Sequence, residues 1–212
     1  MGRCSLIGSI VAALLAVAPV TAHAQQGGDN EAFKAYVTSP AYKTRIKDLV
    51  VASEKMIAPD CQDIAPVERA NLTIYKDILI SGGHPAGGLW GDRIKMRRCG
   101  QATLQSVMFQ AASSFEEPRA QVMAPGDTKA NPALQAVIMA EMAKRVMEAG
   151  CRQQFMVTGT AVSQEIVPIT IGGDKMIKDG EWIEAWQLRA CDQPLEIFFR
   201  LIVADGNIRT QF

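Results

Sequence analysis

Two stretches of the chain, GLWGDRIKMRRCGQ at residues 88–101 and GEWIEAWQLRACDQ at residues 180–193, share one pattern. In both, a glycine stands two positions before a tryptophan and an acid two positions after it. An arginine and a glutamine stand two positions before and after a cysteine. Trp90 and Trp182 are 92 residues apart, and every other match has the same offset. We interpret the pattern as an internal duplication, in which each copy is a strand that ends at a turn carrying the cysteine.

The N-terminus predicts an exported protein. Arg3 is followed by an apolar run from Leu6 to Val20 and by an Ala-x-Ala sequence that ends at Ala24. This order is typical of a secretory signal peptide, and the run is too short to span a bilayer. We therefore expect residues 1–24 to be removed near Ala24 and the mature chain to be periplasmic or secreted. No later segment has the length and apolarity of a transmembrane helix.

The charge balance excludes one class of partner. The chain has 22 Lys and Arg and 22 Asp and Glu, and removal of Arg3 leaves the mature protein close to neutral. A near-neutral surface provides no long-range field for nucleic acid or for an anionic membrane. Nucleic acid is therefore not a predicted partner.

The cysteines predict a covalent framework. Signal-peptide cleavage leaves Cys61, Cys99, Cys151 and Cys191, and an even count in an oxidising compartment indicates two disulfides. Counting alone allows three pairings. If each copy folds as a unit, the pairs are Cys61 with Cys99 and Cys151 with Cys191. The alternative, four thiolate metal ligands, is disfavoured because the chain lacks a Cys-x-x-Cys pair, so we predict no metal and no cofactor.

Each copy is predicted to begin with a helix. Ser39-Pro40 and Asn131-Pro132 both place an N-cap side chain before a proline at the first helical position. The first helix is expected to run to about Ile57 and the second to end near Gly150, each just before a cysteine. Extended segments follow. A helix and a half-apolar sheet must each bury a face, so we expect the helices to cover one face of the sheet or sheets.

The predicted fold is α+β, with an internal duplication in which each copy is a helix followed by three or four antiparallel strands, stapled by one disulfide. Residues 25–112 form the first repeat and residues 131–212 the second repeat. Residues 113–130 are expected to be a connector without strong structure of its own, in which Val122 and Met123 are a candidate short strand. Residues 25–30 are expected to be a polar leader, residues 81–88 a loop, and the apolar run 195–203 a strand buried on both faces. Whether the repeats share one sheet or form two lobes stays open.

The strongest charge feature is a basic row. Arg93, Lys95 and Arg97 alternate along one face of the first repeated strand, where they are suited to bind a carboxylate, a phosphate or an acidic partner. The alternative is a solvated strand face or an edge protected by charge. Arg97 and Arg189 occupy equivalent positions, and we expect them to make the same structural contact in both repeats.

Catalytic groupings are scarce. His84 is the single histidine of the mature chain, which excludes sites that need two imidazoles, and no Gly-x-Ser-x-Gly sequence is present. The glycine-rich residues 81–88 lack the Gly-Lys-Ser/Thr end of a phosphate loop. Asp92 and Glu184, as equivalent acids, are the candidate carboxylate pair for glycoside hydrolysis.

The tryptophans suggest a binding site. A duplicated fold often has its functional surface where the copies meet, so a pocket bordered by Trp90, Trp182 and Trp186 is one hypothesis. Burial in the core is the alternative. We therefore expect an exported, non-catalytic binding or accessory protein whose partner is an envelope protein, a glycan or a small apolar ligand. The alternatives are a hydrolase of envelope polymers that uses Asp92, Glu184 or His84, and a structural envelope protein.

Overall fold

The computed structural model describes residues 23–114, 116–152, 155–173, 175–205 and 207–211, with side chains from residue 30 onward. Most of the predicted signal peptide, residues 1–22, lies outside this range. Within the described residues, no helix combines the length and apolarity that crossing a membrane requires.

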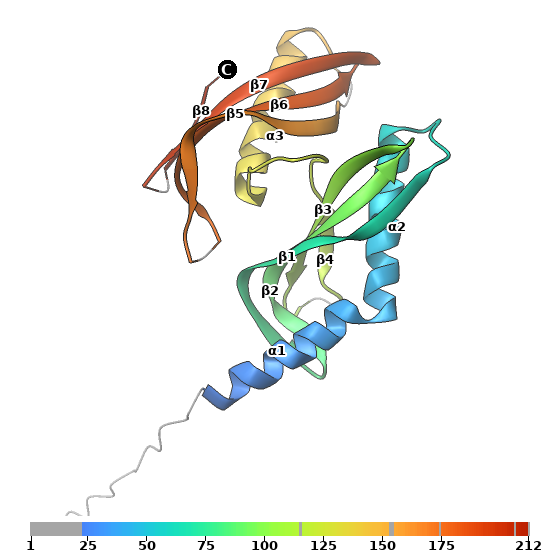
Figure 1. Ribbon diagram of the computed structural model, residues 1–212, viewed down its shortest axis with the longest axis vertical. Coiled ribbons are helices and arrows are strands. Elements are labelled where there is room, and N and C mark those ends of the chain that lie inside the picture. The colour runs from blue at the N-terminus through green and yellow to red at the C-terminus, as the bar shows by residue number, and fades with distance from the viewer. Residues whose placement is uncertain (1–22, 115, 153–154, 174, 206, 212) are drawn as a thin grey trace, which may run out of the picture.

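The chain folds into two similar α+β halves (Figure 1). In the first half, helices α1 (His23–Thr38) and α2 (Pro40–Ile57) precede strands β1 (Ile64–Ser81), β2 (His84–Arg98), β3 (Gln101–Ala111) and β4 (Arg119–Val122). In the second half, helix α3 (Pro132–Glu148) precedes strands β5 (Met156–Ile171), β6 (Ile177–Ala190), β7 (Gln193–Ala204) and β8 (Asn207–Gln211). Each half has its own four-stranded antiparallel sheet, with the strands in chain order. The α+β prediction with two similar halves is confirmed, and the halves do not share a sheet.

Helices α2 and α3 begin as the sequence predicts. The Ser39 side chain accepts a hydrogen bond from the Tyr42 amide, and the Asn131 side chain accepts one from the Leu134 amide. In both helices a proline directly follows the cap. Gly150 then has a φ of +87°, a left-handed conformation that suits glycine after a helix end.

Both predicted disulfides are present, Cys61–Cys99 and Cys151–Cys191, with Cα atoms 5.6 and 5.8 Å apart. Cys99 has a φ of +49° and Cys191 a φ of +48°, and the residue after each also has a positive φ. Two left-handed residues form the tight hairpin turn whose twist matches that of antiparallel strands. Each disulfide therefore ties the segment after a helix to the turn of a hairpin.

The glycine that precedes each repeated tryptophan has a structural reason. Gly88 and Gly180 have φ values of +120° and +143°. A Cβ atom at Gly88 would lie 2.7 Å from the Asp77 carbonyl oxygen, and one at Gly180 would lie 2.9 Å from the Ile169 Cα. Both hairpins bend near these positions (Figure 1). Glycine is repeated because a side chain would prevent this close approach.

Three local predictions need correction. Only Gly82 and Gly83, both left-handed, form the turn expected over residues 81–88, because β2 already begins at His84. Residues 25–30 belong to α1, which is anchored by the burial of Phe33 and Val37 in the first core. The stretch 113–130 contains β4, which pairs with β3 and so completes the first sheet.

Each sheet has one face packed against helices. Helices α1 and α2 lie on one side of the first sheet (Figure 1). On this side Trp90 stacks on Phe109, with ring centroids 5.4 Å apart. Helix α3 packs against the second sheet over Trp182 and Trp186. The prediction that residues 195–203 are buried on both faces is wrong. Burial alternates along β7, so that Phe198, on the face away from the core, is 51% exposed.

Candidate functional site

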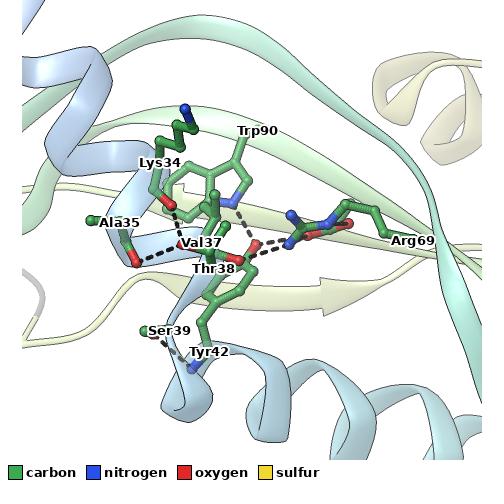
Figure 2. Close-up of polar contacts among 9 residues, drawn as sticks. Lys34, Ala35, Val37, Thr38, Ser39, Tyr42, Arg69 and Trp90 are labelled. Carbon is green, nitrogen blue, oxygen red and sulfur yellow. Dashed lines mark hydrogen bonds and ion pairs between the residues drawn. The ribbon is translucent and has the colours of Figure 1, made fainter.

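Asp92 is the centre of a buried polar cluster in the first half. The Arg69 guanidinium donates two hydrogen bonds to it, with Nε to Oδ1 and Nη2 to Oδ2 both 2.8 Å. The Tyr42 hydroxyl lies 3.3 Å from Oδ2 and accepts a hydrogen bond of 2.8 Å from the Trp90 indole nitrogen. Figure 2 shows the polar ends of Trp90, Tyr42 and Arg69 pointing toward one another beside Val37, whose carbonyl accepts from Arg69. Burial raises the pKa of Asp92, and the charge of Arg69 opposes this rise.

Glu184, at the equivalent position, has a different set of partners. Its carboxylate accepts hydrogen bonds from the indole nitrogens of Trp182 and Trp186, at 2.8 and 2.9 Å. It also accepts from the Thr128 hydroxyl at 2.7 Å and from the Lys129 backbone amide at 2.8 Å. Thr128 and Lys129 belong to the segment between the halves. Glu184 therefore fixes this segment to the second sheet.

These contacts show where the predicted aromatic and acidic site residues lie. The side chains of Trp90, Trp182 and Trp186 are fully buried in the two cores. The structure therefore agrees with burial of the tryptophans in the core and not with a pocket that they border. Asp92 and Glu184 are also fully buried, each within its own half and each with both oxygens hydrogen-bonded. The structure does not bring the two acids together in one cleft.

The basic row of β2 lies on the face of the first sheet opposite α2, and its charges are paired. Arg93 contacts Asp127, with Nη2 to Oδ1 2.7 Å, while Lys95 pairs with Glu68. Arg97 pairs with Asp63, with Nε to Oδ2 2.8 Å, and this hydrogen bond lowers the pKa of Asp63. Each cation of the row therefore has a carboxylate partner within the protein.

The arginine repeated before each cysteine does not repeat its contact. Arg97 pairs with a carboxylate of its own half, whereas Arg189 donates a 3.1 Å hydrogen bond to the Ile57 carbonyl at the end of α2. The expectation of one contact repeated in both halves is wrong. Arg189 instead joins the second half to the first.

His84 is exposed at the start of β2. Its ring lies edge-on to Tyr36, with centroids 6.4 Å apart, at the border of a groove between α1 and α2. Among the described residues, no side chain forms a hydrogen bond with His84, and no group of three or more His, Cys, Asp or Glu residues is placed to hold a metal ion.

A cavity of about 720 Å³ lies between the two halves. Its size is typical of small-molecule sites. On one side it is lined by the open face of the first sheet, including Tyr75, Gly91, Arg93, Ser106 and Met108. On the other side it is lined by the connecting segment and the β5–β6 hairpin, including Lys129, Ile169, Ile171, Lys175 and Ile177.

Gly91 shapes the floor of this cavity. A Cβ atom there would lie 3.1 Å from a ring carbon of Tyr75 and 3.6 Å from the Met108 methyl. The Tyr75 ring therefore covers the strand where a side chain is absent. Burial raises the pKa of Tyr75, and Arg93 opposes this rise. The equivalent position in the second half holds Ile183, which has a large side chain where Gly91 has none.

A short stretch of the connecting segment holds the halves together. The Gly126 amide donates to the Leu104 carbonyl at 2.7 Å, and the Asp127 amide donates to the Thr160 carbonyl at 2.8 Å. The Thr160 hydroxyl donates to the Pro125 carbonyl at 2.7 Å. A second cavity, of about 590 Å³, lies beside Gly126 and Asp127. The junction is thus hydrogen-bonded to both sheets.

Comparison with known proteins gives no family for this chain: no protein-family model matches it, and no curated protein or solved structure is significantly similar. Of the predicted ligand-binding residues, only Arg93 lines the cavity between the halves that has a volume of about 720 Å³. Sequence reasoning missed Tyr75, Lys129 and Lys175. One available signal was the difference between the copies at Gly91 and Ile183, where glycine replaces a large side chain.

Proposed function

We propose that the protein is an exported, non-catalytic binding or accessory protein and that its ligand occupies the cavity between the halves. The observation that supports this most is the composition of that cavity. It combines charged, hydroxyl and apolar side chains from both halves at a position that neither half provides alone. Mostly apolar sites with a few polar groups at defined positions are typical of small-molecule binding.

Export is supported by two features. The N-terminal sequence has the order of a signal peptide, and the two disulfides are consistent with an oxidising compartment. We place the mature protein in the periplasm or outside the cell. Among the predicted partner classes, the volume of the cavity, about 720 Å³, favours a small ligand over an envelope protein or a long glycan.

The alternative, a hydrolase of envelope polymers, has less support. A glycosidase needs two carboxyl groups on either side of one scissile bond. Asp92 and Glu184 lie in separate halves, and each carboxylate is occupied by donors from its own core. A hydrolase would therefore have to depend on His84.

Native mass spectrometry of the protein purified from the periplasm without denaturant tests the proposal. The wild type is expected to carry a bound small molecule. Ser106→Phe introduces at the cavity wall the residue that the second half has at position 198, and it is expected to remove the added mass. The matched control is Phe198→Ser, on the exposed face of β7, which keeps the added mass.

Two results would contradict the proposal. One is the absence of any added mass on the wild type, and the other is its persistence in Ser106→Phe. Turnover of envelope polymers that is lost in His84→Ala would favour the hydrolase.

A further inference from the structure

The lining of the 720 Å³ cavity between the halves has an excess of positive charge. Arg93, Lys129 and Lys175 all line it. The single acid among its lining residues, Asp92, has both carboxylate oxygens held by Arg69. In the described part of the chain, no carboxylate pairs with the ammonium groups of Lys129 and Lys175. A ligand with a negative charge would balance this lining.

Arg93 has an unused donor. Its Nη2 donates to Asp127 Oδ1 at 2.7 Å and to the Gly126 carbonyl at 3.1 Å, so that Asp127 neutralises one end of the guanidinium. Its Nε is buried and has no acceptor among the described residues. A buried donor without an acceptor costs free energy, which a ligand oxygen would recover.

Polar side chains flank Arg93 in the sheet. Asn71 of β1 and Ser106 of β3 are its direct partners in the strand register, and both line the cavity. Directly opposed residues of antiparallel strands have Cβ atoms about 4.5–5.5 Å apart. An amide, a guanidinium and a hydroxyl thus form one row across three strands, which suits an anion with several oxygens.

The opposite wall of the cavity has an apolar part beside Lys129 and Lys175. Ile169, Ile171 and Ile177 of the β5–β6 hairpin line it, and Ile171 is 64% exposed. In the first half, the tip of the corresponding hairpin packs against α1 through the contact of His84 with Tyr36. Among its described residues, the second half has no counterpart of α1. Ile169 and Ile177 also pack against the second core, whereas the exposed Ile171 remains available for an apolar chain, whose burial there is favourable.

We propose that the cavity binds an anionic amphiphile, a molecule with one carboxylate or phosphate group and an aliphatic chain. The anionic group binds at the row of Asn71, Arg93 and Ser106, and the chain packs against the isoleucines of the β5–β6 hairpin. This inference rests on the proposed function, since it names the ligand class of the same cavity.

Isothermal titration calorimetry on the mature chain tests the inference with four probes: decanoate, decyl phosphate, decanol and inorganic phosphate. Decanoate and decyl phosphate are expected to bind at least about 10-fold more tightly than decanol or inorganic phosphate. Only these two probes have both an anionic group for the polar row and an aliphatic chain for the β5–β6 hairpin. The tighter of the two separates a fatty-acid source from a phosphate-monoester source.

A matched pair of variants locates the anionic group. Arg93→Ala is expected to weaken decanoate binding by about 10- to 100-fold and to leave decanol binding unchanged, because the charge-assisted hydrogen bonds are lost. Arg93→Lys retains part of the affinity. Arg97→Ala removes the same charge from the same strand face but outside the cavity, and it leaves binding unchanged. Thermal melts confirm that the variants fold.

Equal affinity for decanol and decanoate, or full decanoate affinity in Arg93→Ala, would overturn the anionic amphiphile. So would the failure of all four probes. If the purified wild type still carries a bound molecule that Ser106→Phe removes, the inference alone is wrong and the cavity remains a binding site. If the wild type carries no bound molecule and no probe binds, the proposed function fails as well.

Discussion

The two halves bury an acid at the same strand position and stabilise it by different means. In the first half a cation, Arg69, forms two hydrogen bonds with Asp92. In the second half Glu184 has four neutral donors, two of them from the segment that joins the halves. A buried carboxylate needs either a counter-charge or a full set of donors. The two similar halves thus share the acid but differ in the groups that stabilise it.

The open faces of the two sheets differ more. The first sheet has Gly91, Arg93 and Ser106 on this face, whereas the second has Ile183, Ala185 and Phe198 at the equivalent positions. Of these residues, Gly91, Arg93 and Ser106 line the 720 Å³ cavity, and Ile183, Ala185 and Phe198 do not. The repeated architecture therefore provides two scaffolds, of which one has the side chains of a polar binding surface.

The largest expected effect of a single substitution is that of Arg69→Met, which removes the counter-charge of Asp92. Breaking a buried ion pair by removing one partner costs about 3–5 kcal/mol, because the remaining charge is left uncompensated. Urea unfolding measures the loss. Lys95→Met, which breaks the exposed pair with Glu68, is the matched control and should have little effect. Similar losses in both variants would show that Asp92 does not depend on Arg69.

The same variant has a predicted pH dependence. Burial raises the pKa of Asp92 in the folded state, so that the folded protein binds this proton more readily than the unfolded chain. Stability from this group therefore falls as pH rises from the ordinary carboxyl range through the raised pKa. Without Arg69 the pKa rises further. The deficit of Arg69→Met should be smaller at about pH 4 than at about pH 7, and an equal deficit at both would contradict this account.

The next effect concerns the connecting segment, which occurs only once in the chain. Gly126 has a φ of +104°, and a Cβ atom there would lie 2.2 Å from the Thr160 carbonyl oxygen. Gly126→Ala should cost about 3 kcal/mol, from the left-handed backbone and the clash together. Gly100→Ala is the control, because its φ is +76° with no atom within 4 Å of a Cβ. It should cost about 1 kcal/mol. An equal loss of stability in both variants would mean that the backbone at Gly126 can move away from Thr160 at little cost.

Glu184→Gln tests the set of neutral donors. The amide NH₂ would face donors that the carboxylate oxygen now accepts from, and an unsatisfied buried donor costs about 2 kcal/mol. Faster hydrogen exchange at the Lys129 amide should accompany this loss, since that amide donates to Glu184. Glu196→Gln, on the exposed part of β7, removes the same charge and should change neither quantity. Unchanged exchange at Lys129 would show that another contact fixes the segment.

Local patterns predicted much of this fold. Ser39 and Asn131 mark two helix starts, because a helix cap depends on residues close together in the sequence. The repeated pattern of the two halves predicted the pairing of both disulfides. The partners of the buried acids were not predictable in this way. Arg69 lies 23 residues from Asp92, and Thr128 lies 56 residues from Glu184, with no periodicity to connect them. The cavity depends in addition on how the connecting segment places the halves.

The smallest expected effect distinguishes the two repeated arginines. Arg97 lowers the pKa of Asp63 through a hydrogen bond, so that Arg97→Ala should raise this pKa toward its ordinary value. A lowered carboxyl pKa stabilises the folded state above the unfolded pKa, and this contribution is lost as pH falls. The variant should therefore have a lower free energy of unfolding than the wild type at neutral pH, and this difference should disappear in acid. Carboxyl NMR titration measures the shift.

Arg189→Ala is the matched substitution in the second half, and its readout is different. It should leave the Asp63 pKa unchanged, because Arg189 contacts the Ile57 carbonyl instead of a carboxylate. Loss of that hydrogen bond weakens the end of α2, so the Ala58 amide, which donates to the Glu54 carbonyl, should exchange faster. An equal shift of the Asp63 pKa in both arginine variants would contradict the different contacts of Arg97 and Arg189.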